Sequence, residues 1–229
     1  MDYAELCERF VATNFPAAAI AVVGGSTARG TRTATSDIDL LLVGDGLFSG
    51  DRDSIAATYR FSGEVIEVFG YTSESFERWA HSGVAQYRPV IAEILVDGMT
   101  IRGGHDLDLL RERWREILAQ GPLVTPHDLE MRRYVITDLL DDLADSTDPL
   151  EQRVIASTLF DRTAELILLA NGRWIGTGKY LPRRLRAFSE HLTQQLSDPL
   201  LSGDLRAFSN EVQLRLQRAG GRVQTGFVR

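Results

Sequence analysis

The sequence predicts a small mixed-sheet domain of the α/β (α+β) class over residues 1–120, followed by an all-α helical bundle over residues 121–229. Strand-like and helix-like segments are mixed in the first half, whereas the second half shows only the apolar spacing of helices. Between the halves, "AQGPLVTPHD" at 119–128 contains two prolines and a glycine, which favour a linker. These three observations predict the class and its division.

Composition excludes several functional classes. The formal net charge of −7 is unlike that of general nucleic-acid binders, which are usually basic. The apolar runs are too short to span a bilayer, and the acidic N-terminus "MDYAELCERF" lacks the features of a signal peptide. One cysteine, Cys7, allows no internal disulfide. We therefore expect a cytoplasmic protein without nucleic-acid or membrane partners.

The first half is expected to alternate strands with helices, each bounded by turn or helix-stop residues. In chain order we expect a helix over 3–14, strands over 17–23 and 38–43, a hairpin in "ATYRFSGEVIEVFGYT" with its turn at Ser62–Gly63, a helix over 73–87, a strand and turn in "AEILVDGMTI", and a helix over 106–119.

The second half carries four segments of helical periodicity and no convincing strand. These segments are residues 128–145, 150–171, 180–197 and 200–219.

Asp37 and Asp39 stand two residues apart in "SDIDLLLV". In a strand, residues i and i+2 project from the same face, so the two carboxylates lie side by side while Ile38 and Leu40 face the core. Carboxylates this close repel each other, and a divalent cation relieves the repulsion because both can bind it. Mg²⁺ commonly takes one or two carboxylates plus substrate phosphates. The pair indicates a metal site; two solvated acids at a strand end are the alternative reading of "DID" by itself.

A glycine-serine turn, Gly25–Ser26, follows the first predicted strand. Glycine allows close backbone approach, and N–H groups in such a turn bind phosphate oxygens. Arg29, Arg32 and Ser36 lie in the polar spacer that follows. Together these residues predict a phosphate cradle beside the metal site.

This arrangement resembles the signature of the DNA polymerase beta nucleotidyltransferase superfamily, in which a glycine-serine pair, a spacer and two acids flanking an apolar residue follow each other. Here a ten-residue spacer separates Ser26 from Asp37. The resemblance implies that residues 1–120 are a nucleotidyltransferase domain and that a later strand supplies a third carboxylate. Glu67 in "EVIEVFGY" fits best; Glu64, the alternative, lies nearer the turn and projects from the opposite face.

The succession of a short first domain and a helical half is similar to the bacterial antibiotic nucleotidyltransferases that modify streptomycin, spectinomycin and kanamycin. In that group the helical domain supplies a lysine to the nucleotide phosphates. Lys179 in "NGRWIGTGKYLPRRL" is the candidate here. The segment is not a P-loop, because Arg173 and Tyr180 stand where that motif needs glycine and a hydroxyl residue.

The resemblance implies transfer of AMP from ATP to a hydroxyl group, with release of pyrophosphate and help from two Mg²⁺ ions. The implied metal ligands are Asp37, Asp39 and Glu67, of which Glu67 serves as a ligand or as a general base. The implied nucleotide-binding residues are Gly25, Ser26, Arg29, Ser36 and Lys179.

The acceptor is less defined, and the resemblance implies a small molecule such as an aminoglycoside antibiotic. An acidic stripe on one helix face could hold its amines or simply be solvated; it comprises Asp138, Asp141, Asp142 and Asp145. Two alternatives stay open: an enzyme that adenylylates a partner protein, as nucleotidyltransferases of toxin–antitoxin pairs do, and a binding module without activity. A homodimer is also open.

Overall fold

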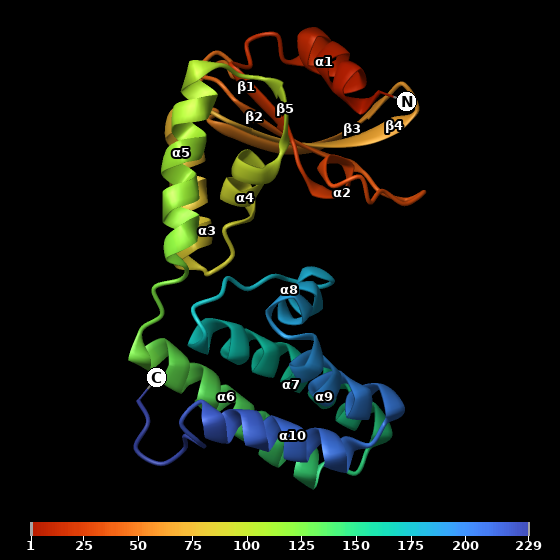
Figure 1. Cartoon of the computed structure of the whole chain (residues 1–229), viewed down its shortest axis with the longest axis vertical. Helices are drawn as coiled ribbons and strands as arrows, with labels where there is room; N and C mark the ends of the chain where they lie inside the picture. Colours follow the sequence, from red (N-terminus) through yellow and green to blue (C-terminus); the bar gives the residue numbers. More distant parts are fainter. Residues whose placement is uncertain (1, 229) are drawn as a thin grey trace. The chain divides into compact units, whose positions relative to one another are not determined.

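The computed structural model describes residues 2–228, which form two units whose boundary along the chain lies between Gln120 and Gly121. The first unit holds a five-stranded sheet with helices, and the described residues of the second unit hold helices without a strand (Figure 1). The predicted class, a mixed sheet followed by a helical region, is confirmed.

The first unit begins with a helix whose N-terminus is capped by the Asp2 carboxylate, which accepts the N–H of Ala4 at 2.9 Å. Its elements are α1 Tyr3–Asn14, β1 Ile20–Val23, α2 Gly25–Ala28, β2 Ile38–Val43, β3 Ser54–Phe61, β4 Glu64–Tyr71, α3 Ser73–Ala85, α4 Val90–Asp97, β5 Met99–Arg102 and α5 His105–Gln120.

The sheet has the strand order β3-β4-β2-β1-β5. β2 pairs in parallel with β4, and every other neighbouring pair is antiparallel. The hairpin between β3 and β4 turns at Ser62 and Gly63, whose φ angles are both positive at 50° and 88°. Two positive φ angles are typical of the hairpin turn whose twist matches the flanking strands. The predicted hairpin is confirmed, and in the sheet β4 lies between β3 and β2.

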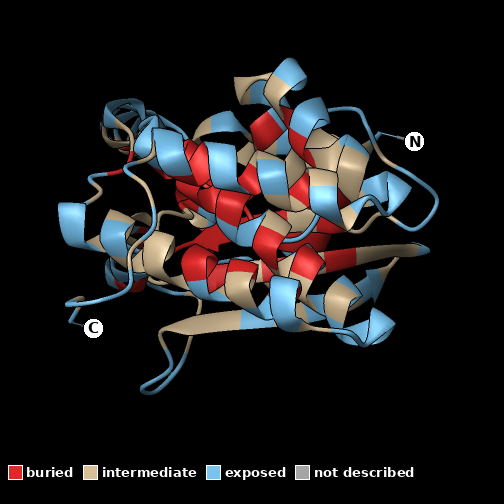
Figure 2. Ribbon diagram, turned by 90° about the horizontal axis from the view of Figure 1, so that it is seen from below, coloured by how far each residue is buried: buried red, intermediate tan, exposed pale blue. Residues whose placement is uncertain are grey.

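Helices cover both faces of the sheet (Figure 1). α1 packs Leu6 and Phe10 on one face, against the β2 residues Ile38, Leu40 and Leu42. The helices α3, α4 and α5 lie on the other face, where β2 supplies Leu41 and Val43. Figure 2 shows buried and exposed residues alternating along single helices, the pattern that amphipathic packing produces. Alternate residues of β2 therefore belong to different cores, and the face of Leu41 is also the face of Asp39.

The strand expected at the start of "AEILVDGMTI" is wrong, because Val90–Asp97 is the helix α4 and only Met99–Arg102 is a strand. A short apolar run does not distinguish a strand from a buried helix by periodicity. The helix ends where the N–H of Gly98 donates to the carbonyl of Ile94 at 3.0 Å, and Met99 then pairs with Val23.

The second unit consists of α6 Pro126–Asp145, α7 Pro149–Ala170, α8 Tyr180–Phe188, α9 Glu190–Ser202 and α10 Leu205–Arg218. The single helix expected over 180–197 is wrong, because Ser189 is extended and divides it. Its hydroxyl accepts the N–H of Leu192 at 3.2 Å and so caps α9. No helix within residues 2–228 combines the length and the apolar character that crossing a membrane requires.

Candidate active site

Asp39 and Glu67 lie beside each other at the middle of the sheet. They are register partners on the parallel strands β2 and β4, so their Cα atoms are separated by about the spacing of neighbouring strands, ~4.8 Å. Residues in register on parallel strands project from the same face, and both side chains are half-buried. The pairing brings together two of the three carboxylates predicted as a site.

Asp37 stands directly before the first residue of β2, on the same face as Asp39 if the strand is continued by one residue. Along a strand, the two residues are about 6.6 Å apart. The negative charges of both aspartates raise the pKa of Glu67, so each of them lies within electrostatic reach of that carboxylate.

The environment of Glu67 resists ionisation. Desolvation by burial raises the pKa of its carboxyl group first, and the negative charges of Asp37 and Asp39 raise that pKa further. A cation held between the carboxylates would offset the increase in pKa that the charges of Asp37 and Asp39 cause. The chemistry of this cluster is therefore that of an anionic site that gains from bound positive charge.

The turn at Gly25 is built against Asp39. Gly25 has a φ of +61°, and a Cβ placed there would overlap Oδ2 of Asp39 and lie 2.8 Å from its Cγ. The N–H of Gly24 donates to the backbone carbonyl of Asp39 at 2.8 Å, which continues the β1–β2 pairing into the turn. No side chain caps the short helix α2 that begins here. Only glycine can bring the backbone this close to the carboxylate.

The polar residues of the spacer, which were predicted to bind phosphate, differ in exposure and in their hydrogen-bond partners. Ser26 is half-buried in α2, and Arg29 is exposed where α2 ends. The hydroxyl of Ser36 accepts the N–H of Thr33 at 2.9 Å, so it is engaged inside the spacer. Arg32, expected near the phosphates with Arg29, instead pairs with Glu64 at 2.7 Å.

The carboxylates suit Mg²⁺ by their chemistry, since carboxylate oxygens are the ligands this ion prefers. Among residues 2–228, however, no three His, Cys, Asp or Glu side chains are already gathered as a metal-binding group. Mg²⁺ is usually held by one or two carboxylates together with substrate phosphates and water, not by a cage made only of protein. The oxygens of Asp37, Asp39 and Glu67 thus suit this ion by their chemistry.

Lys179 belongs to the second unit and stands directly before α8. Its ammonium group lies 5.5 Å from the centre of the Tyr180 ring, and the guanidinium of Arg183 lies at the same distance. Lys179 and Arg183 thus flank one aromatic ring at the beginning of a helix.

The acidic residues of α6 are not uniform. Asp141 forms an ion pair with Arg222 and accepts the side-chain amide of Gln224 at 2.8 Å, so the segment after α10 covers this part of the helix. The four carboxylates of the acidic stripe are therefore not equivalent, because Asp141 is paired with other side chains.

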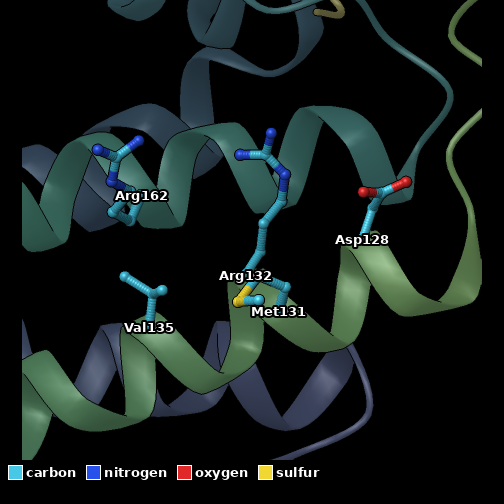
Figure 3. A pocket seen from close by; sticks show the side chains of 5 residues that line it. All are labelled: Asp128, Met131, Arg132, Val135 and Arg162. Atoms are coloured by element: carbon cyan, nitrogen blue, oxygen red, sulfur yellow. The ribbon is translucent and has the colours of Figure 1, made fainter. Parts of the chain in front are cut away.

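Sequence reasoning gave no sign of a cavity of about 270 Å³ in the second unit (Figure 3). It is lined by Asp128, Met131, Arg132, Val135 and Arg162. Figure 3 shows Arg132 reaching from α6 toward α7. The guanidinium groups of Arg132 and Arg162 both donate to the buried carboxylate of Glu165, at 2.7 and 3.2 Å. None of the predicted site residues lines this cavity.

The chain is similar to known nucleotidyltransferases. Residues 5–94 match the family model described as a nucleotidyltransferase domain, and this range includes Gly25, Asp37, Asp39 and Glu67. A nucleotidyltransferase-like protein from Exiguobacterium sibiricum 255-15 has a similar structure, with a TM-score of 0.50 and 12% sequence identity, over 94% of this chain and 75% of that chain. No curated protein matches the sequence.

Proposed function

With the match of residues 5–94 to a nucleotidyltransferase-domain model as the premise, we propose that the protein transfers AMP from ATP to a hydroxyl group of a small molecule. The reaction depends on Mg²⁺ and releases pyrophosphate. An aminoglycoside-type antibiotic is the proposed acceptor class, and the cytoplasm, where ATP and Mg²⁺ are available, is the proposed location.

The observation that carries this proposal is the pairing of Asp39 with Glu67 on neighbouring parallel strands, against the turn at Gly25. Carboxylates held this way would bind a metal–nucleotide complex, and the backbone N–H groups of the glycine-serine turn that leads into the short helix α2 suit phosphate oxygens. Ser26 and Arg29 lie in or directly after that short helix, where they can contact the same phosphates.

The reaction forms a bond between the acceptor oxygen and the α-phosphorus of ATP and breaks the bond from that phosphorus to the bridging oxygen of pyrophosphate. Asp37 and Asp39 would hold Mg²⁺, and the bound ions would neutralise charge on the triphosphate. The remaining work of the chain is to position the nucleotide and the acceptor hydroxyl in line.

Two roles are open to Glu67. As a ligand, it completes the set formed by Asp37 and Asp39. As a base, it accepts the proton that leaves the acceptor hydroxyl, and a raised pKa makes a carboxylate better suited to this task than an ordinary one. The variant E67Q keeps a hydrogen-bond acceptor of the same shape but cannot take the proton.

A cationic acceptor agrees with the net charge of −7. Because Asp141 is engaged by Arg222, a role for α6 in binding amines rests on Asp138, Asp142 and Asp145. Replacing these three by asparagine should raise KM for an aminoglycoside and leave KM for ATP unchanged.

The test is incubation of the purified protein with ATP labelled at the α-phosphate, Mg²⁺ and a panel of aminoglycosides and aminocyclitols. We expect labelled antibiotic, its loss in D39N, and its retention in D51N, which removes an exposed acid between β2 and β3. Label on a co-purifying protein would instead favour the protein-modifying alternative. A wild-type protein that neither transfers label nor binds Mg²⁺-ATP would contradict the proposal.

Lys179 is proposed as a phosphate ligand from the helical unit. The matched variants K179A and R183A each remove one of the two cations beside Tyr180. We expect K179A to raise KM for ATP by about tenfold, the scale of one charge-assisted hydrogen bond, and R183A to change it less than threefold. Equal effects would show that only the general charge of this region matters.

A further inference from the structure

The guanidinium group of Arg32 joins three separate segments of the first unit. Its Nη1 donates to Oγ1 of Thr27 at 2.9 Å and to the backbone carbonyl of Asp37 at 3.1 Å. Its Nη2 donates to the backbone carbonyl of Ser36 at 2.9 Å and to Oε2 of Glu64 at 2.7 Å. One side chain thereby ties α2, the residues directly before β2 and the start of β4 together.

This arginine is held on the face of the sheet opposite to Asp39 and Glu67. Its Cζ lies 4.6 Å from the ring centre of Tyr3 in α1, and Glu64 alternates with Glu67 along β4. The side chains of Arg32 and Glu64 are 15% and 23% exposed, so their charge pair is less screened than an ordinary surface pair. Arg32 does not share the face of the carboxylates.

Asp37 needs such support because it lies outside the sheet pairing. The β2–β4 register begins at Ile38 with Ile66, so Asp39 is fixed by the ladder and Asp37 is not. The bonds from Arg32 to the carbonyls of Ser36 and Asp37 replace the missing pairing on the residue that bears the first carboxylate. The planar fork of arginine can make these parallel bonds, which a lysine cannot reproduce.

We propose that Arg32 is a positioning residue for Asp37, and that Glu64 is the counter-charge that holds Arg32 in place. This inference rests on the proposed function, because it gives Asp37 the task of binding the metal–nucleotide complex. Outer partners of metal ligands typically contribute about 10–100-fold to metal affinity or activity. Loss of the Arg32 bonds should act on that scale.

Arg102 provides a matched control in the same unit. Its Nη1 donates to the backbone carbonyls of Pro16 and Ala18 at 3.2 and 3.1 Å, and its Nη2 pairs with Glu8 at 2.8 Å. It is thus another arginine that binds two carbonyls and one carboxylate, but it sits on the edge strand β5. R102Q should cost stability much as R32Q does, without affecting Asp37.

The experiment measures Mn²⁺ binding by electron paramagnetic resonance, in the presence of a non-hydrolysable ATP analogue, for wild type, R32Q, E64Q and R102Q. Urea unfolding of the same proteins gives their stabilities. We expect Mn²⁺ affinity to fall about 10–100-fold in R32Q, less in E64Q, and under threefold in R102Q. We also expect faster amide hydrogen exchange at Ile38 in R32Q.

Two results would overturn the inference. The first is that R32Q and R102Q bind Mn²⁺ with the same affinity and have the same free energy of unfolding. The other, which applies if R32Q does not fold, is an E64Q protein with the affinity of wild type. Failure of the proposed function is distinguishable, because then the wild-type protein itself would bind no Mn²⁺ with the nucleotide, and both proposals would fall together.

Discussion

Gly25 offers the sharpest test of the site, because its substitution affects the carboxylate of Asp39 directly. The variant G25A places a methyl group on a residue with a φ of +61°, where that methyl overlaps Oδ2 of Asp39. Gly30 is its matched control: it has a φ of +66° and no heavy atom within 4 Å of an added Cβ. The two variants share the backbone strain and differ in the contact.

The magnitudes follow from this difference. An alanine at a left-handed φ costs about 1–2 kcal/mol, so G30A should lower the free energy of unfolding by about that amount. G25A must also move the Asp39 side chain out of its rotamer, which adds about 0.5–1.5 kcal/mol. A displacement of a positioned group by ~1 Å costs about 100-fold in catalysis, so we expect this loss of transfer in G25A.

The assay is Mg²⁺-dependent binding of a fluorescent ATP analogue, followed by transfer of labelled AMP, with urea unfolding on the same samples. G30A should remain within about threefold of wild type in binding and in transfer, since it leaves Asp39 in place. Equal activities of G25A and G30A would refute the reasoning, because they would mean that the close approach of the turn to Asp39 has no consequence for the site.

Three further outcomes are expected. Because the pKa of Glu67 is raised in the folded state, its ionised form destabilises that state. The free energy of unfolding therefore falls as pH rises above the ordinary glutamate pKa of about 4. E67Q should therefore melt at a higher temperature than wild type at pH 7 without metal, and it should lose this advantage at pH 4. It should not transfer AMP. A melting temperature below that of wild type at pH 7 would contradict the repulsion of Glu67 by Asp37 and Asp39. Glu165 is 4% exposed, so E165A leaves Arg132 and Arg162 without their shared carboxylate, but these arginines are partly hydrated. The cost should be about 1–2 kcal/mol by urea unfolding, below the 3–5 kcal/mol of a fully buried pair. Burial raises the pKa of the Cys7 thiol to about 11, against a smaller opposing effect of the Arg32 charge, so a thiol reagent at pH 8 should modify the protein only as it unfolds.

The placement of Asp39 and Glu67 on one face of the sheet could be predicted, because it depends on local periodicity. A third carboxylate was expected only from the family resemblance, and alternation along β4 then separates Glu67 from Glu64. The sequence also contained the turn chemistry of Ser62 and Gly63, which pairs β4 with β3.

Other features depended on contacts that no local pattern contains. The apolar run at Val90–Asp97 is a helix that packs beside β1 and β2, and periodicity could not distinguish it from a strand. Arg32 and Arg29 are both arginines of the same polar spacer, so the sequence does not distinguish them. Only the contacts of Arg32 with Glu64 and Tyr3 show that it lies on the face of the sheet opposite to Asp39. The cavity beside Arg162 arises from the meeting of two helices and has no sequence signal.

The central claim is that Asp37, Asp39 and Glu67 bind metal ions together with a nucleotide. Its most direct measurement is a crystal structure with Mn²⁺ and a non-hydrolysable ATP analogue, with the ions located by anomalous scattering. We expect an ion held by carboxylate oxygens of Asp37 and Asp39, together with phosphate oxygens of the nucleotide. Ions bound elsewhere, or a nucleotide bound away from the Gly25 turn, would contradict the claim.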